Sequence, residues 1–288
     1  DRKLPWPEFV DAYCEAYVGE HMSWDYGWSG NSNNFYSKET KDYTKTLLPE
    51  FSWEESPIDK TDIMLISSHA DDEQLFFAGL LPYYSQVEKL AVQVLYVTDH
   101  LESTGRQQER ERGLWAVGVK TKPDSLRIYD DAGTLNATNW QQGLKVLSKY
   151  GIDEDAFVEM LHEKIMKYKP QVIVTHDING EYKHGMHILV NEMLRKCLEK
   201  HKNEYDFLKK VYFHLYDENP IELSLIDQNF DELEGLTPFQ VTQKYGYEEH
   251  KSQHWTWFTE WIYGKNKDIT LASQISKYSP LRYGLYYG

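Results

Sequence analysis

The stretch Ile63-Met64-Leu65-Ile66-Ser67-Ser68-His69-Ala70-Asp71-Asp72-Glu73 sets a short apolar run directly before a histidine and adjacent carboxylates. Residues 63–66 are typical of a buried strand, and residues 74–81 continue in a pattern that is typical of a helix. In an open α/β sheet, such a turn lies at the carboxyl end of a strand, where these folds bind ligands. The stretch therefore indicates an α/β fold with a metal site and a spare base. The alternative is an ordinary helix start, because acidic residues are also favoured in a first turn.

A second stretch has the same form. Val172-Ile173-Val174-Thr175 is a buried-strand candidate, and the polar turn after it leads to His184 and His187. Apolar residues then recur at helical spacing through residues 188–201, so the two histidines lie at a helix start and can share a face. A lone histidine would usually be a core or surface residue. A pair here, together with His-x-x-Asp after the first strand, favours a functional site.

Taken by themselves, these residues offer His69, Asp72 and one of His184 or His187 as metal ligands. Two imidazoles and a carboxylate suit Zn²⁺ when water takes the remaining position. The same ligand set occurs in Fe(II) enzymes, so it leaves the metal open. Asp71 remains as a base for water on the metal, and the unused histidine is left to polarise a carbonyl or stabilise an oxyanion.

The ordered motifs resemble those of the LmbE-like, or PIG-L, family of metal-dependent de-N-acetylases. The family's first motif, usually His-Pro-Asp-Asp-Glu, stands here as residues 69–73. Its later motif, often Gly-x-Tyr-Gly-His-x-Asp-His, stands here as residues 180–187. Weaker elements also match within residues 60–255: Thr98-Asp99, Arg106-x-x-Glu109, Ala116-Val117-Gly118-Val119, and Lys244 followed by His250-Lys251-Ser252-Gln253.

The resemblance implies a role for each matching position. It implies one Zn²⁺ per chain, held by His69, Asp72 and His187, with Fe²⁺ or another divalent metal as the alternative ion. It makes Asp71 the general base. The further implied roles are a second catalytic group at His184, carbonyl polarisation at Tyr182 and substrate contact at Arg106.

Three positions depart from the family pattern. Ala70 replaces the usual proline, which removes a fixed φ, and we expect the turn to survive. Met186 replaces an aspartate that orients a neighbouring histidine, so we expect another carboxylate to do this, with Asp177 and Asp99 as candidates. Lys183 replaces glycine and adds positive charge near the pocket. These changes bear on substrate and rate more than on reaction type.

The composition is that of a folded, acidic protein. With 288 residues, of which 41% are hydrophobic and 27% charged, the chain is long enough for one large domain with a full core. Its formal charge of −15 disfavours nucleic acid and anionic membranes as partners. No apolar run approaches the length of a membrane span. Two cysteines, Cys14 and Cys197, exclude a disulfide framework and a Cys-rich zinc site.

The chain divides into an extension and a core. Residues 1–58 do not resemble the family, and we expect them to pack on a main domain of residues 59–288. Strands and helices alternate from residue 62, which predicts a Rossmann-like, mainly parallel sheet with helices on both faces. The expected strands are 62–67, 91–97, 125–129, 171–175 and 210–216; the expected helices are 73–86, 105–117, 154–168 and 186–201, followed by a helix-leaning tail at 238–263 and an irregular aromatic end at 278–287.

Aromatic residues are abundant, with 9 Trp and 22 Tyr, and aromatic faces stack on sugar rings in many carbohydrate enzymes. One cluster has partly helical spacing: Trp255, Trp257, Phe258, Trp261 and Tyr263. Because aromatic residues dominate core burial, we interpret this cluster as a packed helix in preference to a sugar platform.

We therefore expect a Zn²⁺-dependent hydrolase that removes acetyl from an N-acetylated amino sugar or glycoconjugate, giving acetate and a free amine. The alternatives are another metal-dependent enzyme on the same ligands, such as a mononuclear-metal hydrolase, a phosphoesterase or an Fe(II) oxygenase, and a non-catalytic carbohydrate-binding protein. No Gly-x-Gly-x-x-Gly or Gly-x-Ser-x-Gly motif is present, which disfavours a dinucleotide enzyme and a serine hydrolase.

Because the chain begins at Asp1 and not at methionine, a soluble, exported or envelope-associated bacterial protein is one expectation. The acetylated substrate and the oligomeric state stay open.

Overall fold

The computed structural model describes residues 53–54, 59–100, 104–265 and 267–288, so the expected extension of residues 1–58 lies almost entirely outside the described residues. Within the described part, a seven-stranded sheet has the order β3-β2-β1-β4-β5-β7-β6. Its strands are β1 (Ile63–Ser67), β2 (Val92–Thr98), β3 (Asp124–Ile128), β4 (Val172–Thr175), β5 (Lys210–His214), β6 (Pro220–Glu222) and β7 (Arg282–Tyr287).

The two strands that precede the polar stretches are neighbours at the centre of this sheet. β1 pairs in parallel with β2 on one side and with β4 on the other. β3 extends the sheet beyond β2, and β5 extends it beyond β4, both in parallel. The order of the strands therefore reverses between β1 and β4, and open α/β sheets bind ligands at the carboxyl edge of such a point.

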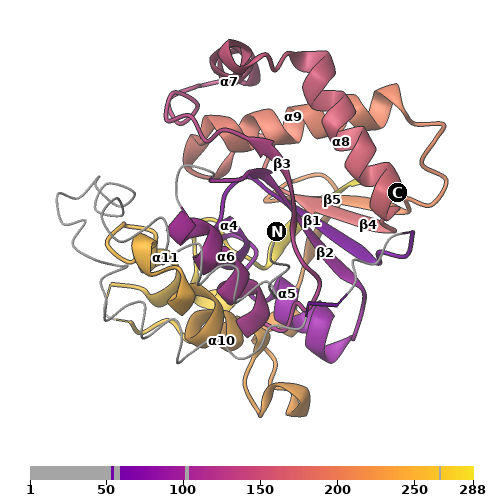
Figure 1. The fold of residues 1–288 in the computed structure, drawn as a ribbon. Coiled ribbons are helices and arrows are strands. Elements are labelled where there is room, and N and C mark those ends of the chain that lie inside the picture. Colours follow the sequence, from indigo (N-terminus) through magenta and orange to yellow (C-terminus); the bar gives the residue numbers. More distant parts are fainter. Residues whose placement is uncertain (1–52, 55–58, 101–103, 266) are drawn as a thin grey trace, which may run out of the picture.

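Helices cover both faces of the sheet, as the alternating sequence pattern predicted (Figure 1). Met64 and Ile66 of β1 pack in one apolar cluster with α8 and α9, whereas Ile63 and Leu65 pack in the other with α5 and α10. Successive side chains of a strand point to opposite faces, so a strand covered on both faces is apolar throughout. The helices are α4 (Asp72–Leu75), α5 (Leu80–Pro82), α6 (Thr104–Ala116), α7 (Trp140–Leu147), α8 (Glu154–Tyr168), α9 (Gly185–Lys200), α10 (Pro238–Val241) and α11 (Thr259–Tyr263).

Three of the expected helices are confirmed, as α6, α8 and α9, whereas α7 was not expected. The helix that was expected over residues 73–86 is interrupted. α4 ends at Leu75, and α5 begins only after Gly79, whose φ of 86° lies in the left-handed region. A Cβ at position 79 would lie 2.8 Å from the Cβ of Ile226, and the Gly79 N–H donates to Thr242 Oγ1 at 2.9 Å. Close contact with distant segments therefore decides where this helix breaks.

The C-terminal segment also differs from the prediction. Residues 282–287, expected to be irregular, form β7, which pairs antiparallel with β5 and with β6. The stretch 238–263, expected to be helical, contains α10 and α11 with 3-10 and π-helical turns between them. Strand formation depends on the neighbouring strand, so the local pattern alone did not reveal β7.

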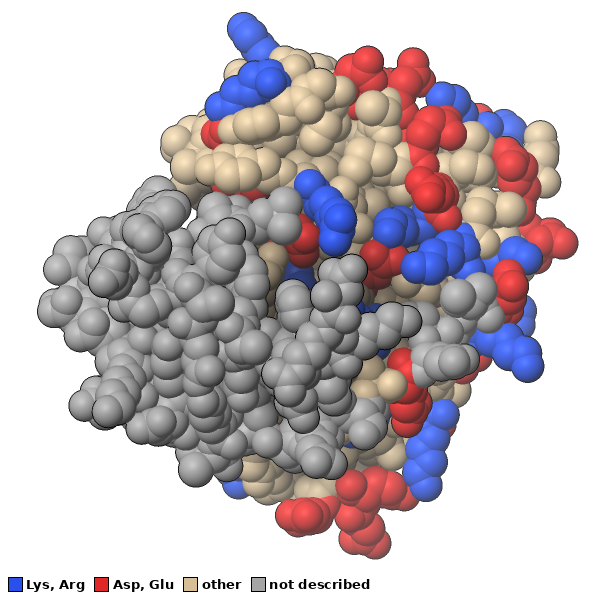
Figure 2. All heavy atoms as spheres, in the orientation of Figure 1, with Lys and Arg blue, Asp and Glu red and all other residues tan. Residues whose placement is uncertain are grey.

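The surface of the described residues carries both signs of charge. Figure 2 shows Asp and Glu side chains intermingled with Lys and Arg over the coloured part of this face. Over the whole chain 46 acidic side chains outnumber 31 basic ones, which disfavours phosphate-rich partners. Among the described helices, none is both long and apolar enough to cross a membrane.

Candidate metal and catalytic site

The turn after β1 holds His69, Asp71 and Asp72, which are all buried. Asp72 Oδ2 accepts the backbone N–H of His69 at 2.8 Å and lies 3.0 Å from Nδ1 of the same residue. Asp71 adopts a φ of 111°, which is strained for a residue other than glycine, and its N–H donates to Glu73 Oε2 at 2.9 Å. Such strain persists only where surrounding contacts enforce it, and it is common at functional sites.

Ala70, which replaces the family's proline, uses the N–H that proline lacks. This N–H donates to His100 Nε2 at 3.2 Å. The Ala70 carbonyl oxygen accepts a hydrogen bond from the guanidinium of Arg106 on α6. The turn therefore forms without proline, as expected, and α6 holds it through Arg106.

His187, from the second stretch, completes a triangle of donor atoms with His69 and Asp72. Its Nε2 lies 3.3 Å from Asp72 Oδ2 and 3.3 Å from His69 Nδ1, and these two atoms lie 3.0 Å from each other. In a tetrahedral zinc site, bonds of about 2.0–2.1 Å place neighbouring ligand atoms roughly 3.3–3.4 Å apart. The three buried side chains therefore have the donor types and the spacing that fit one Zn²⁺ or a similar divalent ion.

Asp71 lies beside this triangle and faces Arg106, with its Oδ1 3.3 Å from the guanidinium. Burial raises the pKa of Asp71 to about 7, although the positive charge of Arg106 acts in the opposite direction. A carboxyl group that titrates near neutrality is suited to accept a proton and to return it. Arg106, the expected substrate contact, is the ion-pair partner of this carboxyl group.

A single buried carboxylate, Glu181, holds three histidines. Its Oε2 lies 2.6 Å from His187 Nδ1 and 2.8 Å from His176 Nδ1. Its Oε1 lies 2.6 Å from His214 Nδ1. A carboxylate on the far nitrogen of a ligating histidine fixes the ring and its tautomer, which leaves Nε2 of His187 free for a metal.

Glu181 corrects the expectation that Asp177 or Asp99 compensates for Met186. Asp177 donates its backbone N–H to Glu181 Oε1 at 3.2 Å, and Asp99 pairs with Arg110 at 3.2 Å. Glu181 opens the short 3-10 turn that precedes α9, and this turn brings its carboxylate against the histidines. The sequence signal for it is the acidic residue directly after the glycine of the second motif.

His184 is the N-cap residue of α9, and its Nδ1 accepts the N–H of Met186 at 3.1 Å. Its ring centroid lies 4.6 Å from those of both His69 and His187. Burial and the two neighbouring imidazoles hold the pKa of His184 well below its usual value, so the ring is neutral with its proton on Nε2. The Tyr182 ring lies 5.4 Å away, and desolvation keeps the pKa of its hydroxyl well above the ordinary value. Both side chains therefore carry a hydrogen-bond donor, and their rings lie next to that of His187.

Three further residues at this carboxyl edge were not predicted. His176 follows β4, and its Nε2 lies 3.6 Å from Asp72 Oδ2. Asp130 follows β3 and lies 3.5 Å from His69 Nε2 and 3.5 Å from Nδ1 of His100, which follows β2. Each of the three comes within two positions of the end of a parallel strand. Applied to the predicted strands, that rule identifies His176 and Asp130 in the sequence, whereas His100 lies three positions after the predicted strand 91–97.

The late motif of the sequence docks against the first. His250 Nε2 lies 3.0 Å from Glu73 Oε1. Glu109 of α6 accepts hydrogen bonds from the Ser252 N–H and hydroxyl at 2.8 and 2.6 Å. Since Glu73 also accepts the N–H of Asp71, these contacts tie the C-terminal segment and α6 to the strained turn.

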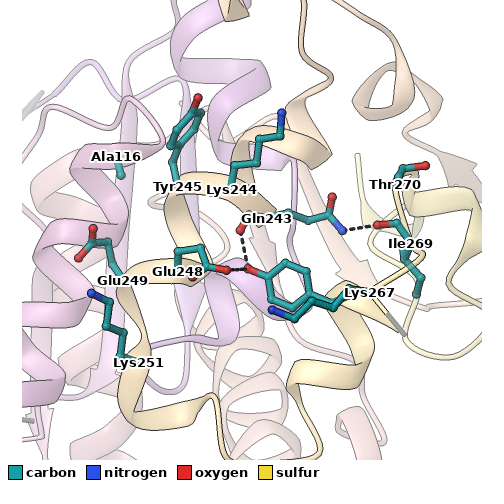
Figure 3. Close-up of a pocket in the computed structure, with 11 residues that line it drawn as sticks. Ala116, Gln243, Lys244, Tyr245, Glu248, Glu249, Lys251, Lys267, Ile269 and Thr270 are labelled. Carbon is teal, nitrogen blue, oxygen red and sulfur yellow. Dashed lines mark hydrogen bonds between the residues drawn. The ribbon is translucent and has the colours of Figure 1, made fainter. Parts of the chain in front are cut away.

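Lys244, the first residue of that late motif, is exposed and lies elsewhere. It lines a cavity of about 680 Å³, in which Glu249 and Lys251 lie on one side and Ile269 and Thr270 on the other (Figure 3). The predicted metal-binding and catalytic residues are not among those that line it. This cavity is therefore separate from the triangle.

Comparison with known proteins agrees with this arrangement of motifs. Residues 64–198 match the family model described as GlcNAc-PI de-N-acetylase, PIG-L. The 1D-myo-inositol 2-acetamido-2-deoxy-alpha-D-glucopyranoside deacetylase 1 of Saccharopolyspora erythraea is 25% identical over 165 residues, which are 48% of this chain and 54% of that protein. The chain thus spans about half the length of this curated relative.

The comparison with solved structures gives similarities at low sequence identity. The N,N'-diacetylchitobiose deacetylase of Pyrococcus horikoshii has a TM-score of 0.47 and 13% identity, with 80% of this chain and 84% of that chain covered. A deacetylase in the biosynthesis pathway of teicoplanin has a TM-score of 0.48 and 15% identity, with 78% and 97% covered. The motif-bearing segment of the chain, residues 64–198, is thus similar to the PIG-L, or LmbE-like, family.

Proposed function

We propose that this protein is a zinc-dependent de-N-acetylase of an N-acetylated amino sugar or its conjugate, with one Zn²⁺ per chain. The observation that carries the proposal is the triangle of His69, Asp72 and His187 with Asp71 beside it. The family match supports the reaction, and the name of the curated relative supports a 2-acetamido sugar as substrate class. The three side chains would hold Zn²⁺, which when bound would act as a Lewis acid and lower the pKa of water.

The residues around the triangle carry out proton transfer and stabilise the developing negative charge. Asp71 accepts the proton of the attacking water and returns it to the departing amine, since burial raises its pKa to about 7. Arg106 holds the Asp71 carboxyl group in place. His184 and Tyr182 donate hydrogen bonds to the oxygen of the acetyl group as negative charge develops on it. The products are acetate and a free amine.

A two-metal phosphoesterase is less well supported by the described residues. Such enzymes hold two ions about 4 Å apart, each with its own ligands. His176 is close enough to serve a second ion, but its Nε2 accepts the Ser68 N–H at 2.9 Å and its Nδ1 faces Glu181 at 2.8 Å. Both nitrogens are therefore engaged, which favours one ion.

Acetate release from a panel of N-acetylated amino sugars tests the proposal. Metal-free protein is compared with protein reconstituted with one equivalent of Zn²⁺. We expect release from at least one sugar, and only with the metal present. A protein that binds one zinc and binds the sugars, yet releases no acetate, would instead be a carbohydrate-binding protein on the same fold.

A further inference from the structure

A second cluster of histidine and glutamate side chains lies where α8 packs against the end of α9 (Figure 1). One ring nitrogen each of His162 and His201 and a carboxylate oxygen of Glu159 lie within 4.8 Å of one another. His201 directly follows α9, whereas His187 lies in the first turn of that helix. At 1.5 Å per residue, the helix places His201 roughly 20 Å from His187. The cluster is therefore separate from the triangle.

Both imidazole rings of this cluster are oriented through Nδ1. The rings stack, with centroids 3.6 Å apart and planes at 12°. His162 Nδ1 lies 2.8 Å from the hydroxyl of the buried Tyr205, which itself lies 3.2 Å from Cys197 Sγ. His201 Nδ1 lies 2.8 Å from Glu204 Oε1. A ring that donates a proton from Nδ1 to such a partner keeps a lone pair on Nε2 for a metal.

The contact between His201 and Glu159 requires a positive charge. His201 Nε2 lies 3.1 Å from Glu159 Oε1, and both atoms are acceptors when the ring is neutral with its proton on Nδ1. A second carboxylate is close, since Glu204 Oε2 lies 3.7 Å from His162 Nε2. Lys200 supplies one positive charge, with its Nζ 3.0 Å from Glu159 Oε1. A divalent cation would satisfy the imidazole lone pair and the carboxylate together.

We propose that Glu159, His162 and His201 bind a Zn²⁺ ion that ties α8 to the end of α9, in addition to the ion of the candidate site. Two imidazoles and a carboxylate suit Zn²⁺, whereas Mg²⁺ and Ca²⁺ prefer oxygen ligands. Binding draws the donor atoms to about 3.3–3.4 Å from one another and tilts the stacked rings until their lone pairs converge. None of the three side chains is fully buried, so each has room to adjust.

This surface ion should be held more weakly than an ion in the triangle. The triangle is buried, whereas the Glu159 side chain is 50% exposed, so water screens its charge. Lys200 must also give up its contact with Glu159 when the ion binds. Dialysis against zinc-free buffer should therefore remove the surface ion and leave one zinc per chain in the triangle.

Calorimetric titration of the dialysed protein with Zn²⁺ tests the proposal. The wild type should show one binding event, and His201→Gln should lose it because glutamine removes one imidazole ligand. Glu159→Gln changes an exposed carboxylate and should lose most of the event as well, which covers the case that His201→Gln folds poorly. His254→Gln is the matched control, since it replaces a partly buried imidazole outside both sets of ligands and should bind like the wild type.

A change at Lys200 should act in the opposite direction. Lys200→Gln removes the cation that competes for Glu159 and should tighten zinc binding by about two- to fivefold, the worth of an exposed ion pair. Mg²⁺ in place of Zn²⁺ should give no comparable event, because it prefers oxygen ligands. An equal event with Mg²⁺ would overturn the proposal in favour of unspecific binding to surface carboxylates.

The proposal does not depend on the proposed function, and a further variant separates the two. His187→Ala breaks the triangle and should retain the event that depends on His201, whether or not the wild type releases acetate. Loss of that event in His187→Ala would assign the ion to the triangle and overturn the proposal. No event in the wild type, or an equal event in the wild type and His201→Gln, would overturn it as well.

Discussion

His187 Nδ1 lies 2.6 Å from Glu181 Oε2, so the imidazole that completes the triangle of donor atoms is oriented by a carboxylate within the same motif. This contact leaves Nε2 of His187 directed at Asp72 and His69, from which it is 3.3 Å distant in each case. The ring can then bind a metal without first turning or changing its tautomer.

Replacement of Glu181 is expected to weaken zinc binding. Glu181→Gln removes the charge that orients His187, and the loss of such a partner typically lowers metal affinity by about 10–100-fold. The measurement is a competition titration against a zinc-binding dye. Glu199→Gln, at an exposed position of α9 that pairs with Lys202, is the control and should bind zinc normally. If Glu181→Gln bound zinc with unchanged affinity, Glu181 would not be the group that orients His187 for the metal.

The two histidines at the start of α9 should respond differently to truncation. His187→Ala is expected to lose bound zinc, because it removes one corner of the triangle. His184→Ala is expected to keep the zinc and to lower kcat by roughly 10²–10³, the effect of one missing oxyanion donor. Metal content by plasma mass spectrometry, combined with acetate release, separates the two. The reverse pattern would exchange their roles.

Replacement of Gly79 by alanine should destabilise the protein, and a second glycine, Gly151, separates the cost of overpacking from the cost of backbone strain. Gly79 and Gly151 both have positive φ, at 86° and 78°, but a Cβ would meet Ile226 Cβ at 2.8 Å at the first position and nothing within 4 Å at the second. Gly151→Ala should cost about 1–2 kcal/mol through backbone strain alone. Gly79→Ala should cost roughly 1–3 kcal/mol more because it also overpacks the core. Urea unfolding of both variants checks this, and equal losses would contradict it.

Asp124 should contribute to stability in a pH-dependent way. Burial acts to raise the pKa of Asp124, but hydrogen bonds from Lys164 at 2.7 Å, Lys167 at 2.9 Å and Tyr168 at 2.7 Å outweigh it and hold the pKa well below its ordinary value. A depressed folded-state pKa stabilises the protein above the unfolded-state value, about 3.9, and this contribution is lost as the pH falls further.

Asp124→Asn tests this contribution by urea unfolding at several pH values. The variant should be less stable than the wild type between pH 5 and 8, by an amount that shrinks below about pH 4 as the wild-type contribution is lost. The control is Asp217→Asn, since the Asp217 side chain is 89% exposed beside Arg282 and should contribute little at any pH. If the difference in unfolding free energy between the wild type and Asp124→Asn stayed constant down to pH 2, the depressed pKa of Asp124 would not be its cause.

The centre of the sheet and the position of the site could be predicted from sequence because their signals are local. An apolar run that ends in a polar turn marks both β1 and β4, and the topology then brings His69 and His187 together. The helix break at Gly79 could not be predicted in this way, because it depends on contacts with Ile226 and Thr242, which are far away in sequence.

Residues that depend on distant partners account for the other differences. β7 exists because β5 offers it a partner, and its own aromatic pattern does not indicate a strand. Trp257 has the spacing of a buried helix residue, yet it lies just before α11 and is 47% exposed. Local spacing shows which residues can share a face, but it does not show which faces the rest of the chain covers.

The most direct test of the account is Asp71→Asn, with metal content and acetate release measured on the same sample. Asparagine keeps the shape of the side chain but cannot accept the proton of water, so the variant should retain one zinc per chain and lose about 10²–10⁴-fold in turnover. The control is Asp177→Asn, which changes a carboxylate outside the triangle and should retain both the bound zinc and the turnover. Near-normal acetate release from Asp71→Asn with its zinc in place would contradict the account.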